Sequence, residues 1–153
     1  MQTVLVLHSL LRWAVLLLGI FVLFSSLSGV ISRRTFTNRD SRANFFFMLS
    51  CDVQLLLGII LYFTNSWFDR LKDLGSQMKD ANNRFFTIEH MSLMLIAWIL
   101  VHIGRTSVAR ATGSTSKHRR ALIFFGLAIL LILVSIPWPF REAVARPWLR
   151  GFN

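Results

Sequence analysis

Apolar residues fill four long segments of this 153-residue chain, and polar or charged residues fill the stretches between them. The segments cover about residues 4–31, 43–64, 85–108 and 121–137. A helix needs about 20 mostly apolar residues to cross the hydrocarbon core of a bilayer. Backbone groups in lipid must be hydrogen-bonded within their own segment, so each segment predicts a transmembrane helix. The short connections make neighbouring helices antiparallel, which predicts an all-α polytopic membrane protein with an up-down four-helix bundle.

Two stretches outside the spans are expected to lie at the membrane surface. In residues 66–84, the apolar side chains of Trp67, Leu71, Leu74 and Met78 follow the spacing i, i+4, i+7 and i+11. This spacing favours a short interfacial helix between the second and third spans. The tail, residues 138–153, follows Pro137 and is rich in tryptophan, proline and arginine, so we expect it to cap the bundle at the interface.

The composition restricts the class of protein further. Hydrophobic residues make up 54% of the chain, and the formal net charge is +10. All of the lysines and arginines except Arg12 lie in connections, at segment ends or in the tail, where basic side chains contact lipid headgroups. We therefore expect these basic residues to bind the lipid bilayer and not a nucleic acid. Cys51 is the one cysteine, which excludes an intrachain disulfide and a Cys-based zinc or iron–sulfur site.

The basic residues also predict an orientation. The first and third connections together carry nine Lys and Arg residues, whereas the second connection and the tail carry seven. The excess places the first and third connections in the cytoplasm and both termini on the outer side of a bacterial cytoplasmic membrane. His118 lies in the run Lys117-His-Arg-Arg120 and is expected to be a solvated part of the third connection.

Ionisable residues inside the spans are the candidates for function, because charge in hydrocarbon is costly. They are His8 and Arg12 in the first span, Asp52 in the second, and Glu89, His90 and His102 in the third.

His8 and His90 are expected about one turn below the outer ends of their helices. Two imidazoles from different helices at similar depth are the arrangement that axial ligation of a b-type haem requires. Arg12 would pair with Glu89 or approach a haem propionate, and Arg141 is a second propionate partner. The alternative is that both histidines are interfacial side chains bonded to backbone or headgroups.

A second group lies deeper. Asp52 and His102 are close enough in depth to form a hydrogen-bonded pair, and with Gln54 and Glu89 they would line a proton or quinone path. The alternative is a structural ion-pair network that fixes helix register. A copper or zinc site from His8, Glu89 and His90 is a further alternative, although adjacent helical residues point about 100° apart.

Four runs in the chain carry a resemblance to a known group of proteins: Leu7-His-Ser-Leu-Leu-Arg-Trp13, Asp52-Val-Gln-Leu-Leu-Leu-Gly58, Phe85-Phe-Thr-Ile-Glu-His90 and Ile136-Pro-Trp-Pro-Phe-Arg141. They resemble small bacterial four-helix membrane proteins that are described as cytochrome-b-like. The resemblance implies a four-helix architecture, with His8 and His90 as the motif histidines and Arg12, Glu89 and Arg141 as their companions. The first span lacks the second histidine that di-haem bundles have, so at most one haem is expected.

These observations favour a small b-type cytochrome or haem-binding subunit, with one haem near the outer face, that exchanges electrons with quinol. Two alternatives stay open. One is a cofactor-free accessory subunit that docks onto other membrane subunits, and the other is a proton-coupled transport or metal-binding module, for which the short chain would need to form a homo-oligomer. Whether the protein catalyses a reaction is also left open.

Overall fold

Four membrane-spanning helices form the molecule in a computed structural model that describes residues 2–149. Three of the long elements are α1 (Gln2–Ile31), α2 (Asn38–Thr64) and α6 (Ser114–Ser135). The fourth is a continuous helical run, Ala81–Arg110, made of α4 (Ala81–Arg84), the π-helical turn η2 (Phe85–Glu89) and α5 (His90–Arg110). All four are long and apolar enough to cross a membrane, which confirms the predicted multi-pass bundle.

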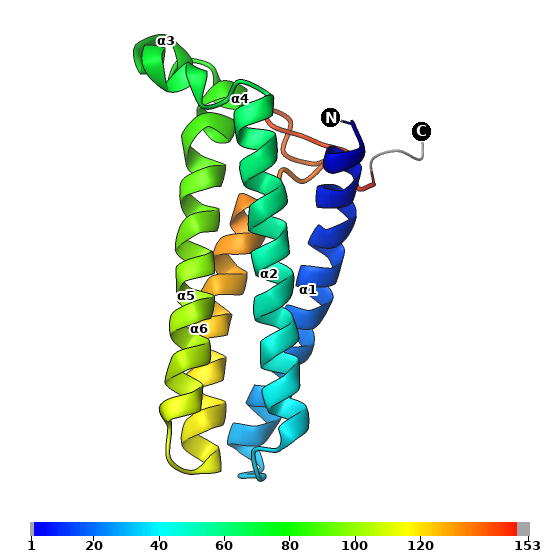
Figure 1. The fold of residues 1–153 in the computed structure, drawn as a ribbon, viewed down its shortest axis with the longest axis vertical. Helices are drawn as coiled ribbons and strands as arrows, with labels where there is room; N and C mark the ends of the chain where they lie inside the picture. Colours follow the sequence, from blue (N-terminus) through cyan, green and yellow to red (C-terminus); the bar gives the residue numbers. More distant parts are fainter. Residues whose placement is uncertain (1, 150–153) are drawn as a thin grey trace.

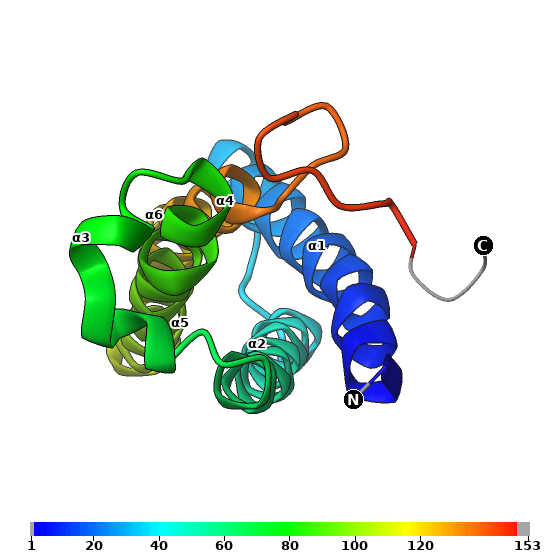
Figure 2. The ribbon, with the colours of Figure 1, turned by 90° about the horizontal axis from the view of Figure 1, so that it is seen from above.

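The helices form a ring in the order α1, α2, α5, α6 (Figures 1 and 2). Helix α1 packs against α2 and α6, and α5 packs against the same two neighbours, so α1 and α5 lie diagonally opposite each other. The N-terminus, α3 (Leu74–Gln77), α4 and the tail lie at one end of the bundle, which we call the tail end. The connections from α1 to α2 and from α5 to α6 lie at the other end, the loop end.

The core is mostly apolar, while large apolar side chains also cover the outside. Phe47 and Phe125 are fully buried and meet edge to face, with ring centroids 5.5 Å apart. On the outer surface, Leu17 and Phe24 are 67% and 68% exposed, as side chains in contact with lipid would be. A Cβ added at Gly104 would lie 2.7 Å from Phe124 Cβ, so this glycine lets α5 and α6 approach closely.

At the loop end, a buried ion pair joins the first connection to α2. Asp40 is 7% exposed, and its Oδ1 accepts hydrogen bonds from Arg34 Nη2 at 2.6 Å and from Ser25 Oγ at 2.8 Å. The Asp40 bond raises the pKa of Arg34 above its usual value. Thr37 and Asp40 form a capping box, which begins α2 at Asn38, five residues before the predicted start of the span.

The expectation for His118 was wrong. His118 is fully buried in the second turn of α6, where its ring packs 5.0 Å from the ring of Phe36 and against Gly29. It lies on the same helix face as Ala121, Phe125 and Ile132, which are also buried, while the basic residues next to it in sequence point elsewhere. The helix face, and not the basic sequence around it, decides the position of this residue.

The stretch 66–84 is at the predicted surface position but is not one helix. It consists of the 3₁₀ turn η1 (Asp69–Asp73), the single turn α3 and the separate turn α4. The Asp80 side chain accepts a bond from Asn83 N and so begins a new helix at Ala81, which interrupts the expected stripe. Leu74 and Met78 remain 40% and 44% exposed, as expected for side chains that face the membrane surface.

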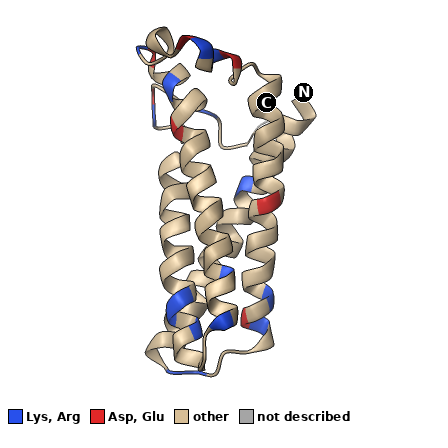
Figure 3. Ribbon diagram, turned by 60° about the vertical axis from the view of Figure 1, so that its left-hand side comes forward, with Lys and Arg blue, Asp and Glu red and all other residues tan. Residues whose placement is uncertain are grey.

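The tail folds back over the same end. Residues 137–149 run without a helix, and the carbonyl of Trp148 accepts bonds from Arg12 Nη2 and Trp13 Nε1. The last part of the predicted tail, residues 150–153, lies outside the described residues. Charged side chains gather at the two ends of the bundle and are sparse between them (Figure 3), as a membrane-spanning protein requires.

Candidate cofactor site

A central cavity of about 650 Å³ lies between the helices toward the tail end. Its volume falls within the range of about 300–1,000 Å³ that is usual for small-molecule and cofactor sites. All four spans contribute to its wall. The wall includes His8 and Arg12 from α1, Gln54 and Gly58 from α2, His90 and Trp98 from α5, and Arg146 from the tail.

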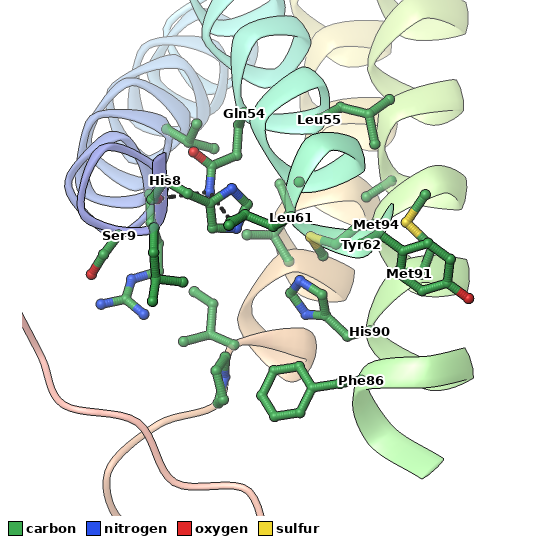
Figure 4. Close-up of a pocket in the computed structure, with 18 of the residues that line it drawn as sticks. His8, Ser9, Gln54, Leu55, Leu61, Tyr62, Phe86, His90, Met91 and Met94 are labelled. Atoms are coloured by element: carbon green, nitrogen blue, oxygen red, sulfur yellow. Dashed lines mark hydrogen bonds between the residues drawn. The ribbon is translucent and has the colours of Figure 1, made fainter. Parts of the chain in front are cut away.

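His8 and His90 enter this cavity from diagonally opposite helices (Figure 4). His8 lies six residues after the start of α1, which is about 9 Å along the helix axis. His90 lies nine residues after Ala81, about 13 Å into its helical run. The structure therefore brings together the two histidines that the sequence singled out, although both lie deeper than one helical turn.

The orientation of His90 follows from the end of helix α6. Ser135 is the last residue of α6, and the last four carbonyls of a helix have no partner within the helix. The Ser135 carbonyl is therefore free and accepts a bond from His90 Nδ1 at 2.8 Å. Pro137 stops the helix two residues beyond Ser135. Because Pro137 has no N–H, the carbonyl of Leu133 is also free, and Trp138 Nε1 donates to it at 2.9 Å.

This bond decides which ring nitrogen of His90 carries the proton. A carbonyl oxygen only accepts, so Nδ1 must donate, and in a neutral imidazole Nε2 then holds the lone pair. Histidines that bind metals are usually held by such a bond from the second ring nitrogen to a carbonyl or carboxylate. His90 thus carries its proton on Nδ1, and the bond to the carbonyl holds the ring in place, as a histidine that ligates through Nε2 requires.

The backbone before His90 is also unusual. Residues Phe85–Glu89 form a π-helical turn, in which the His90 N–H bonds to the carbonyl of Phe85 five residues back. Tyr62 on α2 donates its hydroxyl to the carbonyl of Thr87 at 2.7 Å, which supports the turn from the neighbouring helix. Single π-helical turns are rare and occur frequently at functional sites.

His8 is held by α2. The Gln54 Nε2 amide donates to the His8 carbonyl at 3.1 Å and lies 3.3 Å from His8 Nε2. A Cβ added at Gly58 would be 3.3 Å from His8 Cε1, so the glycine provides room for the ring. The long contact to Gln54 is the one that His8 would give up in order to ligate a metal through Nε2.

Several polar atoms of the cavity wall have no hydrogen-bond partner within the described chain. They are His8 Nδ1, Ser9 Oγ and Gln54 Oε1, all buried. A buried polar atom without a partner costs about 1–3 kcal/mol, and such groups in a native structure call for a bound species. Their concentration on one wall favours a ligand with polar groups in this cavity.

The predicted companions of the histidines divide into two groups. Arg12 lines the cavity as expected. Arg141 does not, because its Nη1 donates to the carbonyls of Val134 and Ile136 at the end of α6. The predicted Arg12–Glu89 pair is also wrong, since Glu89 Oε1 accepts from Arg84 Nε at 2.7 Å. Arg146 lines the cavity instead of Arg141, and the sequence analysis did not identify it.

The predicted Asp52–His102 pair does form. His102 Nε2 donates to Asp52 Oδ1 at 2.7 Å, and Trp98 Nε1 donates to the same oxygen at 2.6 Å. Trp98 also lines the central cavity, so the pair lies one side chain away from it.

A conventional copper or zinc site is not formed. Between residues 2 and 149, no group of three or more His, Cys, Asp or Glu side chains is placed to hold a metal ion. The alternative site from His8, Glu89 and His90 is therefore not assembled, because Glu89 points to Arg84.

Comparison of the chain with protein-family models, with curated proteins and with solved structures finds no match. The function therefore has to be argued from the cavity and its residues.

Proposed function

We propose that this protein is a small membrane cytochrome subunit that binds one b-type haem in the central cavity, with His8 and His90 as axial ligands. The observation that carries the proposal is the pair of imidazoles from diagonal helices on one cavity, with His90 Nδ1 bonded to the Ser135 carbonyl. Diagonal helices are the ones that can hold a flat group between them in the middle of a four-helix bundle.

The residues present fit such a group. The cavity volume of about 650 Å³ lies in the range for cofactors, and its wall is mostly apolar. Arg12 and Arg146 line it with guanidinium groups, which suit the carboxylates of the two haem propionates. A haem held by two histidines supplies reversible one-electron transfer.

The same proposal includes an orientation and an electron donor. The tail end would face the outer side of a bacterial cytoplasmic membrane, as the distribution of Lys and Arg predicts. A lipid-soluble quinol would supply electrons, because the bundle is surrounded by lipid and the cavity lies within it.

The haem content of histidine variants tests the proposal. We expect purified protein, expressed with a haem supply, to contain about one haem per chain and to give a reduced-minus-oxidised absorption difference. His8→Ala and His90→Ala should each lose most of this haem, because each removes one axial ligand. His102→Gln is the matched control, since His102 lies in the same bundle but binds Asp52 outside the cavity wall.

A folded wild-type protein without haem or iron would contradict the proposal and favour the accessory subunit. Haem that persists in the His8→Ala, His90→Ala double variant would show that the ligands are other residues.

A further inference from the structure

The Asp52–His102 pair lies deep in the membrane. Asp52 is fourteen residues from the start of α2 and twelve from its end. His102 is eight residues before the end of α5, which is about 12 Å along the helix axis. Asp52 is thus near the middle of its span, whereas His102 lies toward the loop end, with Arg105 one turn further along α5.

Both members of the pair are partly exposed at this depth. The side chains of Asp52 and His102 are 33% and 37% exposed, respectively. A carboxylate or imidazole that is open to hydrocarbon is costly unless a polar group covers it. Within residues 2–149, Trp98 is the one further residue that bonds to either of these two side chains, through Asp52 Oδ1.

The hydrogen bonds within the pair determine what the missing partner must offer. His102 Nε2 donates to Asp52, so Nδ1 of a neutral ring carries a lone pair and acts as an acceptor. Asp52 Oδ2 is also an acceptor, and no bond to it is formed by residues 2–149. The open positions are thus acceptors, and the group that satisfies them must bring O–H or N–H donors.

His102 also faces a space large enough for a ring. A second cavity of about 500 Å³ lies toward the loop end and is lined by His102, Ile103, Thr106, Ser107, Arg110 and Arg120. Its volume is sufficient for a small aromatic molecule.

We infer that His102 and this second cavity bind the head group of a lipid-soluble hydroquinone, with a hydroxyl of the ring donating to His102, whose ring Asp52 orients. The inference rests on the proposed function, because it names the site of the quinol that would supply electrons to the haem subunit. Trp98, which bonds Asp52 and lines the central cavity, connects the two sites through a single side chain.

A hydroquinone suits the pair better than a phospholipid does. Phospholipid acyl chains have no O–H or N–H donor, whereas a hydroquinone carries two O–H donors on an apolar ring and moves within the hydrocarbon. General-base sites use the same arrangement: a carboxylate orients an imidazole, and the other nitrogen of the imidazole accepts a proton. The quinone form has carbonyl acceptors in place of the hydroxyls, so the site should prefer the reduced ligand.

Binding of two matched ligands tests the inference. We would measure the Kd of tetramethylhydroquinone and of its dimethyl ether, which lacks both O–H donors, for the full chain in phosphatidylcholine nanodiscs under anaerobic conditions. Empty nanodiscs correct for partition into lipid. The hydroquinone should bind at least about tenfold more tightly than the ether, since a hydrogen bond to a charged or strongly polar group is at stake.

Two variants should remove this preference. His102→Leu deletes the acceptor. Asp52→Asn removes the charge that orients the ring and keeps the shape of the side chain, so it is the variant to measure if the leucine variant does not fold. Ser92→Ala, an exposed position on the same helix, is the control and should keep the preference.

The results separate this inference from the haem proposal. Equal binding of the two ligands to the wild type would overturn the hydroquinone site, and so would a preference that both variants keep. Either result would indicate that a polar group of another subunit contacts the pair instead. Haem content is measured on the same samples. A haem-containing protein without ligand preference refutes this inference alone, and a colourless protein with the preference refutes the haem alone.

Discussion

The ring of His118 occupies the space that a side chain at position 29 would need. A Cβ added at Gly29 would lie 2.4 Å from two atoms of the ring, closer than real Cβ contacts allow. His118 is fully buried between α1 and α6, so its ring has little freedom to move aside. The glycine is therefore required by its neighbour and not by its backbone.

Gly29→Ala should destabilise the protein by about 2 kcal/mol, because overpacking of a tight interior costs about 1–3 kcal/mol. The change should become neutral or stabilising in a His118→Ala background, where alanine has the better helix propensity and the ring is gone. Thermal or denaturant unfolding in detergent measures both effects.

Gly75→Ala is the matched control, because nothing lies within 4 Å of a Cβ at that position. If Gly29→Ala destabilises equally in the presence and absence of the His118 ring, the proposed contact is not the cause.

Some residue positions could be predicted from the sequence, and others required the tertiary structure. His8, His90, Asp52 and His102 were identifiable because an ionisable residue stands out against an apolar span. His118 was misjudged from its basic neighbours, although its spacing from Ala121 and Phe125 continues the buried face of α6 and would have located it. Arg146 could not be found, since it reaches the cavity only when the tail folds back across the bundle.

At the level of elements, the end of one helix positions a side chain of another. Pro137 stops α6, the last carbonyls of the helix have no backbone donors, and side chains of Trp138 and His90 bond to two of them. The sequence predicted the stop at Pro137, but not that the free Ser135 carbonyl would orient His90. Which distant donor bonds to a free carbonyl depends on helix packing, which a local sequence pattern does not contain.

The interfacial stretch 66–84 shows the opposite case. The cap at Asp80 starts a new helix there, so the apolar spacing over the longer stretch does not produce one continuous helix.

The connection between α1 and α2 should depend strongly on Asp40. Asp40→Asn removes the charge that Arg34 pairs with and leaves one acceptor oxygen in place of two for the donors Arg34 and Thr37. We expect a loss of about 2 kcal/mol in the free energy of unfolding, since hydrogen bonds to the buried carboxylate contribute about 1.5–3 kcal/mol and the remaining Arg34 is 33% exposed. Denaturant titration of the detergent-solubilised protein gives the value.

Asp69→Asn provides the comparison, because the Asp69–Lys72 pair lies on the surface with both side chains more than half exposed. It should change the stability little. Similar losses for the two variants would mean that the Asp40 network stabilises the protein no more than the surface pair does.

At the scale of the whole molecule, the four spans were predictable because membrane insertion is decided by length and apolar composition. The ring order of the helices was not, since the sequence does not state which faces meet. That order determines the candidate site, because it puts α1 and α5 on a diagonal with the cavity between them.

The orientation of the bundle can be measured with single cysteines in a Cys51→Ala background. We expect Gly75→Cys, in α3 at the tail end, to react with a membrane-impermeant maleimide in intact cells with the outer membrane permeabilised. Thr115→Cys, at the loop end, should react only after the cytoplasmic membrane is opened. The reverse pattern would show that the excess of basic residues in the first and third connections does not set the orientation.

Electron paramagnetic resonance of the oxidised, haem-loaded protein tests the central claim most directly, because the spectrum reports the axial ligands of ferric haem. We predict a low-spin signal for the wild type, as two imidazole ligands produce. His8→Ala and His90→Ala should each convert the remaining haem to a high-spin signal. A low-spin signal that survives in both variants, or a wild type without any ferric haem signal, would contradict ligation by this pair of histidines.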